Sequence, residues 1–479
     1  MNEKFLIKQI LNQFPYAPTQ DQRDLLHKLA GFIQNSGDQS VFILKGYAGT
    51  GKTSLISAFV KTLNDIKIRF RLMAPTGRAA KVLAHYSGFP AFTIHKQIYW
   101  QKSGGNVFSG FELGYSKFNN TIFIVDEASM ISNNYVPNSI FGSGRLLNDL
   151  LQYVFSQENC SLILIGDTAQ LPPVNTDLSP ALDETELRAM NMQVTDYELT
   201  EVIRQSTKSG ILMNATKLRK KISDDPESLP ELDTQSYHDI ERITGNELVD
   251  TLETTYDDAG INEVKIICRS NKNANVYNQG VRNQILWREE ELSPGDLLMV
   301  VKNNYSWLPE KAPVDFIANG DMVEIVRLRK MHDMYGHRFQ DAEIRFVDYP
   351  ELEIEVRLML DCLDIDGPSL PSQKSQAFYE NVKLDYQHLD QKKQMEALRK
   401  DPFLNALQVK YAYAMTCHKS QGGQWHSIFI DQGYVTREMM GISYYRWLYT
   451  AITRATHKVY LVNFPDAWFN GEDSSDSEA

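Results

Sequence analysis

A glycine-rich stretch near the start of the chain has the residue types and spacing that bind a nucleoside triphosphate. The apolar run Val41–Leu44 leads into G-x-x-x-x-G-K-T at Gly46–Thr53, and a helical pattern follows. Glycines allow several backbone N–H groups to converge on one phosphate, and the following helix adds its positive end. Lys52 would reach the β- and γ-phosphates, and the Thr53 hydroxyl would bind Mg²⁺. The same loop would contact the nucleotide through Gly46, Ala48, Gly49, Thr50, Gly51 and Ser54.

Two carboxylates follow a second apolar run, Thr121–Val125, which is typical of a buried strand in a parallel sheet. Beside a phosphate loop, Asp126 is expected to hold Mg²⁺, and Glu127 to orient or deprotonate the attacking water. Without that loop, we would interpret Asp126 and Glu127 as a turn at the end of a strand. Gln170 follows a further apolar run, Cys160–Ile165, and its amide could sense the γ-phosphate by switching hydrogen bonds after hydrolysis.

Other polar residues have less specific signals. Gln22 precedes a helical run for which Thr19 is a candidate N-cap, and its amide could read an adenine edge, although a solvent-exposed glutamine is the more common case. Thr76 and Arg78 follow the strand 68–74, where ligands gather in open α/β sheets. They are placed for a phosphate backbone, and for Arg78 a solvated helix face is an equal alternative.

Composition sets the broad class. The chain has 479 residues, 42% hydrophobic and 23% charged, so two to four soluble domains are expected. No apolar run approaches the ~20 residues of a membrane span, and no export signal is visible at the N-terminus. The four cysteines are widely spaced, which fits a reducing cytoplasm and argues against zinc or disulfides. The net charge of −12 speaks only weakly against a nucleic-acid partner, because binding depends on a local basic groove.

The order of strands and helices predicts an α/β protein with two domains. We expect a nucleotide domain over residues 1–185 and a second domain over 186–290 and 401–470, interrupted by an insertion over 291–400 that combines a small antiparallel barrel with a helical segment. Aromatic residues around glycines at 97–120 predict an inserted β-hairpin, either a pin or stacking platform for bases or a hairpin packed on its neighbour. The acidic tail 471–479 is expected to be disordered.

The ordered motif series resembles that of superfamily 1 DNA helicases, most closely the RecD/Dda-like branch with a UvrD-like C-terminal domain. The most diagnostic pieces are T-C-H-K-S-Q-G at 416–422 and T-A-I-T-R-A at 450–455. The resemblance covers nearly the whole chain and is weakest over 210–260 and 330–400. It implies two RecA-like P-loop domains, with parallel sheets flanked by helices and an SH3-like barrel as the insertion in the second.

The resemblance also implies roles for individual residues. Gln22 would contact adenine, Gln170 would couple the γ-phosphate to DNA, and Arg204 and Arg454 would act as arginine fingers from the second domain. ATP and Mg²⁺ would be the cofactors, and a monomer would act on single-stranded DNA and its junctions with duplex, moving 5′→3′. The residues in motifs near the single strand are Pro75, Thr76, Arg78, His95, Thr416 and His418.

One departure from the family pattern concerns the ribose. Many relatives have an acidic residue after Ser-Gln-Gly, whereas this chain has Gly423-Gln424-Trp425.

An RNA helicase of the same superfamily and a P-loop ATPase that is not a helicase remain alternatives. Stimulation of ATP hydrolysis by DNA or RNA would discriminate between them.

Overall fold

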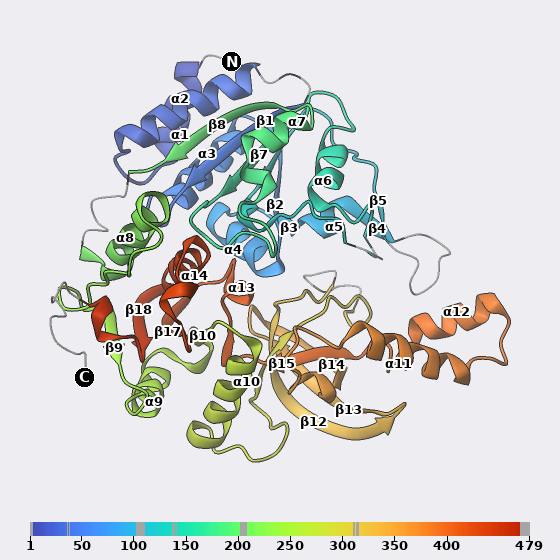
Figure 1. Ribbon diagram of the computed structural model, residues 1–479. Coiled ribbons are helices and arrows are strands. Elements are labelled where there is room, and N and C mark those ends of the chain that lie inside the picture. Colours follow the sequence, from blue (N-terminus) through green and yellow to red (C-terminus); the bar gives the residue numbers. More distant parts are fainter. Residues whose placement is uncertain are drawn as a thin grey trace.

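Two parallel sheets, a closed barrel and a short hairpin make up the molecule. The computed structural model describes residues 3–35, 37, 39–101, 111–136, 139, 141–201, 208–309, 312 and 316–469. In Figure 1 the first sheet and its helices form the upper half, the second sheet lies at the lower left, and the barrel lies at the lower right. Among the described residues, no helix has both the length and the apolar character needed to cross a membrane.

The first sheet has six parallel strands in the order β3-β2-β6-β7-β1-β8. Branched and aromatic residues fill its central strands, and separate hydrophobic cores cover its two faces, as expected for a parallel sheet buried between helices. The strands are β1 (Ser40–Gly46), β2 (Arg69–Ala74), β3 (Ala91–Thr93), β6 (Thr121–Val125), β7 (Ser161–Gly166) and β8 (Gln193–Leu199). The helices are α1 (Glu3–Gln13), α2 (Gln20–Asn35), α3 (Lys52–Asp65), α4 (Gly77–Ser87), α5 (Ile94–Ile98), α6 (Leu146–Val154) and α7 (Glu184–Ala189).

Strand β8 belongs to the first sheet although it lies beyond residue 185, where we expected the first domain to end. It pairs in parallel with β1 through the register Ser40↔Gln193 to Gly46↔Leu199. Leu199 is fully buried in the core under α1 to α3. The extra strand therefore covers β1, which would otherwise be the edge of the sheet.

The second sheet also has only parallel strands, in the order β16-β10-β17-β18-β9. Helix α14 packs against it and is buried on nearly all sides, which fits its mostly apolar sequence. The strands are β9 (Ile240–Ile243), β10 (Val264–Cys268), β16 (Ala414–Thr416), β17 (Trp425–Asp431) and β18 (Ala455–Val462). The helices are α8 (Gly210–Asp224), α9 (Leu248–Ala259), α10 (Asn271–Gly280), α13 (Cys417–Ser420) and α14 (Ile442–Ile452).

The insertion forms the predicted barrel, which closes in the order β11-β12-β13-β14-β15. Its closing strand is β15, which pairs with both β11 and β14 and lies beyond the expected end of the insertion at residue 400. The strands are β11 (Leu297–Val300), β12 (Met322–Met334), β13 (His337–Phe346), β14 (Tyr349–Met359) and β15 (Leu407–Tyr411). The helical segment is a pair, α11 (Ser372–Asp385) and α12 (Gln391–Lys400), that projects to the right in Figure 1.

The predicted hairpin is present as two short antiparallel strands, β4 (Tyr99–Gln101) and β5 (Phe111–Leu113). The segment between these strands lies outside the described residues. The aromatic ring of Phe111 stacks on Phe141 of the first domain at 4.9 Å and contacts Tyr305 of the insertion at 4.9 Å. The hairpin therefore packs against two neighbours. The acidic tail also lies outside the described residues.

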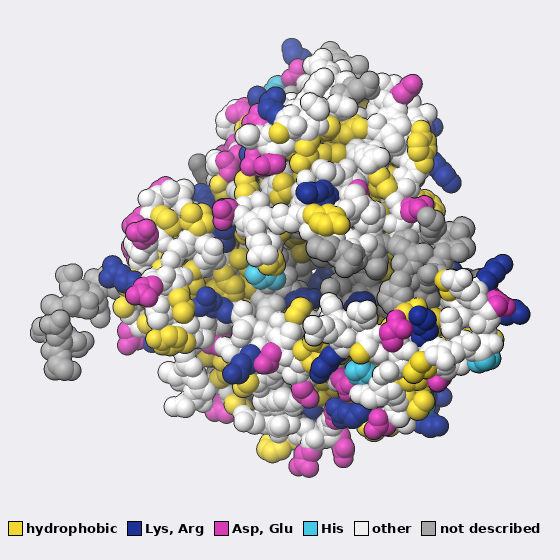
Figure 2. All heavy atoms as spheres, turned by 45° about the vertical axis from the view of Figure 1, so that its right-hand side comes forward, with side chains coloured by type: hydrophobic (Ala, Val, Ile, Leu, Met, Phe, Trp, Pro, Cys, Tyr) yellow, Lys and Arg dark blue, Asp and Glu magenta, His cyan; other side chains and the backbone are white. Residues whose placement is uncertain are grey.

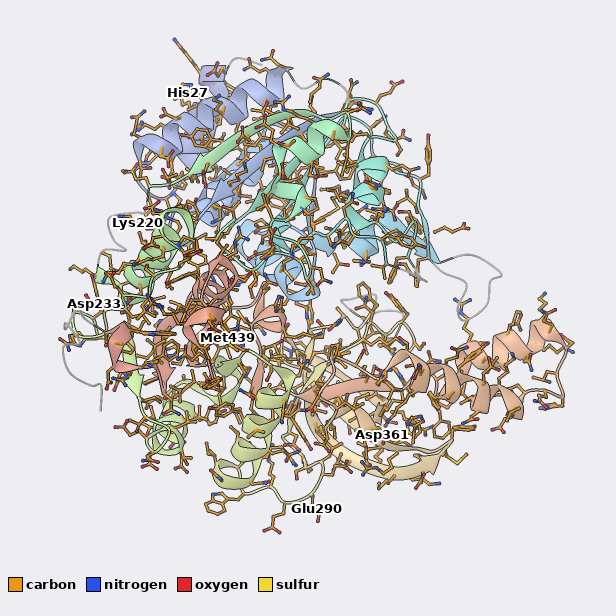
Figure 3. The ribbon with its side chains drawn as sticks, in the orientation of Figure 1. His27, Lys220, Asp233, Glu290, Asp361 and Met439 are labelled. Atoms are coloured by element: carbon orange, nitrogen blue, oxygen red, sulfur yellow. The ribbon has the colours of Figure 1, made fainter. Side chains whose placement is uncertain are left out.

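One buried carboxylate joins the barrel to the second domain. Asp296 is fully buried and accepts hydrogen bonds from Arg282 (3.1 Å), Arg288 (2.7 Å), the Tyr413 hydroxyl (3.0 Å) and the backbone N–H of Ser293 (2.7 Å). The segment that brings the two arginines to it runs along the lower edge of the molecule, where Glu290 is labelled in Figure 3. Two cations and two neutral donors compensate the buried charge.

We expect Asp296→Ala to destabilise this part of the protein strongly, because it leaves the buried guanidinium of Arg282 and the half-buried guanidinium of Arg288 without their carboxylate partner. Removing one side of a buried ion pair costs about 3–5 kcal/mol. For the second domain with its barrel, this loss of free energy should lower the unfolding temperature by roughly 10 °C, measured by calorimetry. The exposed Glu289 is the matched control, and Glu289→Ala should leave the transition within about 1 °C. An unchanged transition in Asp296→Ala would contradict the role of this cluster.

Candidate nucleotide site and adjoining groove

The phosphate loop joins the end of β1 to the start of α3. Gly49 and Gly51 have φ angles of 80° and 81°, in the left-handed region that favours glycine. At Gly46 a Cβ atom would lie 2.9 Å from the Lys52 side chain and 3.1 Å from Leu199. The glycines of the motif are therefore required by backbone conformation at two positions and by space at the third.

Side chains inside the loop hold its backbone in place. The Lys52 ammonium donates to the carbonyl oxygens of Tyr47 (2.8 Å) and Gly46. Gln22 is buried rather than exposed, and its amide donates to the Thr50 carbonyl at 2.9 Å while accepting from the backbone of Thr19 at 3.1 Å. Gln22 thus supports the loop directly, and contact with adenine stays a prediction.

The two predicted carboxylates lie at the same edge of the sheet as the loop, because the carboxyl ends of parallel strands meet there. The backbone N–H of Glu127 donates to Asp126 at 2.9 Å, and Glu127 has a φ of 53°, an uncommon conformation that recurs at functional sites. Burial raises the pKa of Asp126, which Lys52 opposes. Burial also raises the pKa of Glu127 to about 7, against the opposing effect of Arg454, with a further increase from Asp126.

The residues present fit a divalent cation of the magnesium type. Thr53 and Asp126 line the same small cavity as Lys52. A hydroxyl and a carboxylate are hard oxygen donors, the class that Mg²⁺ prefers. Mg²⁺ binding itself stays a prediction.

Gln170 lies in the segment after β7 that faces the second domain. Its side-chain oxygen is buried, and it has no hydrogen-bond partner among the residues that the structure describes. The next residue, Leu171, is bonded twice to the second domain, since its N–H donates to Thr450 at 2.9 Å and its carbonyl accepts from Gln421 at 2.7 Å. An unpaired acceptor at this boundary is suited to orienting a water molecule or sensing a bound group.

Arg454 reaches the same boundary from the end of α14. It is 3% exposed, and it donates to the carbonyl oxygens of Thr450 (3.1 Å) and Gly423 (3.3 Å). Its positive charge acts on Glu127 across the boundary. Arg204, the other predicted finger, lies outside the described residues.

A groove of about 510 Å³ brings most of the predicted DNA-contacting residues together. The first domain supplies Pro75, Thr76, Arg78 and His95, and the second supplies His418. Thr416 is not part of this lining, although it lies just before α13. The barrel contributes residues that the sequence did not single out, among them Lys302 and Phe316. Figure 2 shows the molecule hollowed between its upper and lower halves.

The groove is cationic and partly aromatic. Among the described residues that line it, none is Asp or Glu. Its cations are Arg78, Lys302 and Lys419, and its aromatic residues are Phe141, Phe316 and Trp425. Burial lowers the pKa of His95 to about 4, so this imidazole is neutral near pH 7. Lys419 lies within the motif T-C-H-K-S-Q-G at 416–422. Lys302 and Phe316 of the barrel lie in no motif, so the sequence could not predict their place in the groove.

Arg78 lines the groove and also contacts the second domain. Its guanidinium stacks on the Trp425 ring at 4.1 Å and donates to the Gln424 carbonyl at 3.2 Å, so it bridges the two domains. The Trp425 ring of β17 covers one face of the guanidinium, while Arg78 is half-buried and lines the groove, so its contact with a phosphate backbone stays a prediction. Thr76 caps α4 by accepting from the Ala79 N–H at 3.2 Å.

Gly422 of the second domain packs closely against the first domain. This residue has a φ of 74°, and a Cβ atom there would lie 2.9 Å from Ala79 and 3.0 Å from the Thr76 hydroxyl. Both the conformation and the space at this position therefore require glycine.

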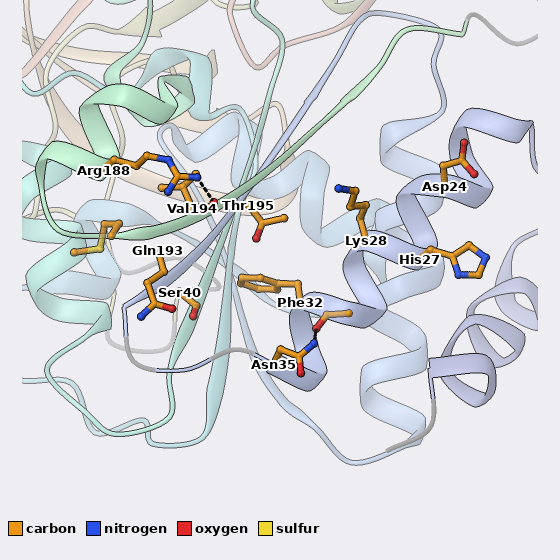
Figure 4. Close-up of a pocket in the computed structure, with 12 residues that line it drawn as sticks. Asp24, His27, Lys28, Phe32, Asn35, Ser40, Arg188, Gln193, Val194 and Thr195 are labelled. Atoms are coloured by element: carbon orange, nitrogen blue, oxygen red, sulfur yellow. Dashed lines mark hydrogen bonds between the residues drawn. The ribbon is translucent and has the colours of Figure 1, made fainter.

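A larger cavity of about 750 Å³ lies away from this chemistry, between α2 and β8 (Figure 4). It reaches Ser40, the first residue of β1, whereas the phosphate loop follows the last residue of that strand. Arg188 at its rim donates to the Val194 carbonyl at 2.8 Å, the contact dashed in Figure 4. Its residues lie at the end of the strands opposite to the one where ligands bind in such sheets.

Two family models match the chain. One, described as an AAA domain, matches residues 18–237, and the other, described as a UvrD-like helicase C-terminal domain, matches residues 411–462. The first matched range includes the phosphate loop, and the second includes helix α14 and Arg454.

Individual proteins are similar to the chain at lower identity. The ATP-dependent RecD2 DNA helicase of Deinococcus radiodurans is 28% identical over 198 residues, which are 41% of this chain and 24% of that protein. The chain thus spans about a quarter of the RecD2 protein. An uncharacterized protein of Acanthamoeba polyphaga mimivirus is 22% identical over 518 residues, covering 90% of this chain and 97% of that protein. The solved structure of a Pif1 helicase from Bacteroides, in complex with ADP-AlF3 and single-stranded DNA, is 15% identical, with 94% and 93% of the chains covered and a TM-score of 0.46.

We expect Lys52→Ala to weaken binding of ATP by roughly 10- to 100-fold, because it removes a charge-assisted hydrogen bond to phosphate. Isothermal titration calorimetry with Mg²⁺-ATP measures the effect. Lys61 lies on the exposed face of the same helix, and Lys61→Ala should bind ATP like the unaltered protein. Equal affinity in both variants would place the phosphates elsewhere.

Proposed function

We propose that this chain is a superfamily 1 helicase with an AAA domain and a UvrD-like C-terminal domain. It uses ATP hydrolysis to move along single-stranded DNA and to unwind duplex DNA. The observation that carries the proposal is the groove. It runs through residues of the first domain, the barrel and the second domain, and Gln421 of its lining donates to the carbonyl of Leu171, next to Gln170. A ligand in this groove contacts both domains at once.

The charge of the groove supports a nucleic acid as its ligand. The chain as a whole carries a net charge of −12, yet none of the described residues lining the groove is acidic. Cations at Lys302 and Lys419 suit a phosphate backbone, and the ring of Phe316, which is 9% exposed, lines the groove and would offer an aromatic surface to a base. Stacking on exposed base faces favours a single strand over a closed duplex.

The nucleotide site supports hydrolysis that depends on both domains. Lys52 would hold the terminal phosphates, and Glu127, with its raised pKa, would accept a proton from the attacking water. Mg²⁺ held by Thr53 and Asp126 would neutralise phosphate charge. Arg454 would stabilise charge on the transferring phosphoryl group from the second domain. Domain closure would therefore complete the site, and closure would also alter the groove.

The aromatic contacts of the hairpin support a role at the junction between single-stranded and duplex DNA. Phe111 of the hairpin contacts Tyr305 at 4.9 Å, and Tyr305 contacts Phe316 of the groove at 5.1 Å. This row of rings braces the hairpin against the barrel. A braced hairpin next to the groove is suited to separating strands as one of them is drawn through.

We expect single-stranded DNA to raise the ATPase rate, and we expect strand displacement from duplexes with a 5′ tail. The 5′→3′ direction rests on the family resemblance, and comparing 5′- and 3′-tailed duplexes measures it. Displacement from 3′ tails alone would refute the direction. Stronger stimulation by single-stranded RNA than by DNA would favour an RNA helicase, and no stimulation by either would favour an ATPase of another class.

We expect Arg454→Ala to lower the DNA-stimulated rate of ATP hydrolysis by ~10³-fold or more while ATP still binds, because an arginine finger acts mainly on the transition state. Phosphate release and binding of a fluorescent ATP analogue measure the two effects. Arg437→Ala, at an exposed arginine of the same domain, is the control and should retain the full rate. Unchanged turnover in Arg454→Ala would refute a shared site between the two domains.

A further inference from the structure

Tyr449 connects the second domain directly to the phosphate loop. It lies on α14, is 1% exposed, and its hydroxyl accepts a hydrogen bond from the backbone N–H of Ala48 at 2.9 Å. The same hydroxyl donates to the carboxylate of Asp167 at 2.7 Å. Ala48 and Asp167 both belong to the first domain, so one side chain of the second domain fixes two elements of the first relative to each other.

Both partners of Tyr449 are connected to the predicted nucleotide site. Ala48 is in the middle of the phosphate loop, whose backbone N–H groups form the phosphate cradle. Asp167 follows β7, its other carboxylate oxygen accepts from the Ala169 N–H at 2.9 Å, and its charge contributes to the raised pKa of Glu127. The Tyr449 hydroxyl thus joins the phosphate cradle to a carboxylate that acts electrostatically on the predicted base.

The protonation of Tyr449 is fixed by its surroundings. Burial and the neighbouring Asp167 raise its pKa well above the usual value for a tyrosine, and the Ala48 N–H and Arg219 only partly oppose them. The hydroxyl therefore stays protonated. Its O–H donates a hydrogen bond to Asp167, and its oxygen accepts the hydrogen bond from the Ala48 N–H.

A second contact from the same domain holds the residue next to Ala48. The guanidinium of Arg219, on α8, lies 4.1 Å from the centre of the Tyr47 ring, and one of its nitrogens is buried without a hydrogen-bond partner among the described residues. The core-facing residues of α8, such as Leu218, share a hydrophobic core with Leu448 of α14. The two helices therefore form one packed unit that touches consecutive residues of the loop.

We propose that Tyr449 is a positioning residue for ATP hydrolysis, through which the second domain sets the geometry of the phosphate loop. The inference rests on the proposed ATPase function and deepens it. In this arrangement Arg454 acts on the reacting phosphate, whereas Tyr449 acts only through Ala48 and Asp167. Movement of the second domain is transmitted to the loop by one hydroxyl group, and Arg219 supports the neighbouring Tyr47.

The test is Tyr449→Phe, which removes the hydroxyl and retains the ring. We expect kcat for DNA-stimulated ATP hydrolysis to fall about tenfold, the effect of losing one hydrogen bond to a charged group. KM for ATP should change by less than about twofold, because the loop still binds phosphate through its other donors. Tyr444→Phe is the matched control on the same helix, since its buried hydroxyl donates to Gln432 at 2.6 Å, outside the site, and it should retain the full rate.

A second pair of variants tests the neighbouring contact. Arg219→Ala should lower kcat in the same way, whereas Lys220→Ala, at the exposed residue beside it on α8, should not (Figure 3). Combining Asp167→Asn with Tyr449→Phe should lower kcat no further than the worse single variant, because both substitutions interrupt one connection.

The outcomes separate this inference from the proposed function. An unchanged kcat in Tyr449→Phe, equal losses in Tyr449→Phe and Tyr444→Phe, or a raised KM at constant kcat would each overturn the positioning role. A rate that single-stranded DNA fails to raise in the unaltered protein would overturn the proposed function instead. The same variants, compared in the basal ATPase reaction, would then still decide the role of Tyr449.

Discussion

At the boundary between the two domains a glycine packs against the N-terminus of a helix, and the walls of the groove depend on this contact. A Cβ atom on Gly422 would lie within 3.0 Å of both Ala79 and Thr76. Only a residue without a side chain lets the loop after β16 reach α4 at this distance. Because α4 and the loop after β16 both line the groove, the same contact determines where its two walls meet. The stacking of Arg78 on Trp425 at 4.1 Å lies beside it and closes the same boundary.

Local charge matters more than net charge in this molecule. A chain with a net charge of −12 would be repelled by a polyanion if its acids were spread evenly. Near the groove, Asp321 and Asp348 lie 3.4 and 3.0 Å from the ammonium of Lys81, which offsets part of their charge, and neither carboxylate lines the groove. Lys302 and Lys419 remain in the lining, where no described residue is acidic. Over the short range of screened electrostatics, this local surface decides what can bind.

The sequence predicted those parts of the site in which the signal is contained in consecutive residues. The phosphate loop, the pair Asp126-Glu127 and the positions of Gln170 and Arg454 each follow from one short segment. Pairing between distant segments could not be predicted in this way, and it gave β8 to the first sheet and β15 to the barrel. The same reason applies to Arg78, whose surroundings depend on a strand more than 300 residues later, and to Phe316, which enters the groove from the barrel.

The segment after β7 is where the two halves of the chain are most strongly connected. Asp167 accepts from Tyr449, and Leu171 is hydrogen-bonded to Thr450 and Gln421. Ala169 and Leu171 also pack in the hydrophobic core of the second domain, although they follow β7 of the first sheet. Any relative movement of the domains must therefore either carry this segment along or break buried hydrogen bonds, which costs free energy. Gln170 lies between these anchors with a buried oxygen that has no hydrogen-bond partner among the described residues, so a change in domain spacing acts on its side chain as well as on the phosphate loop that Tyr449 contacts.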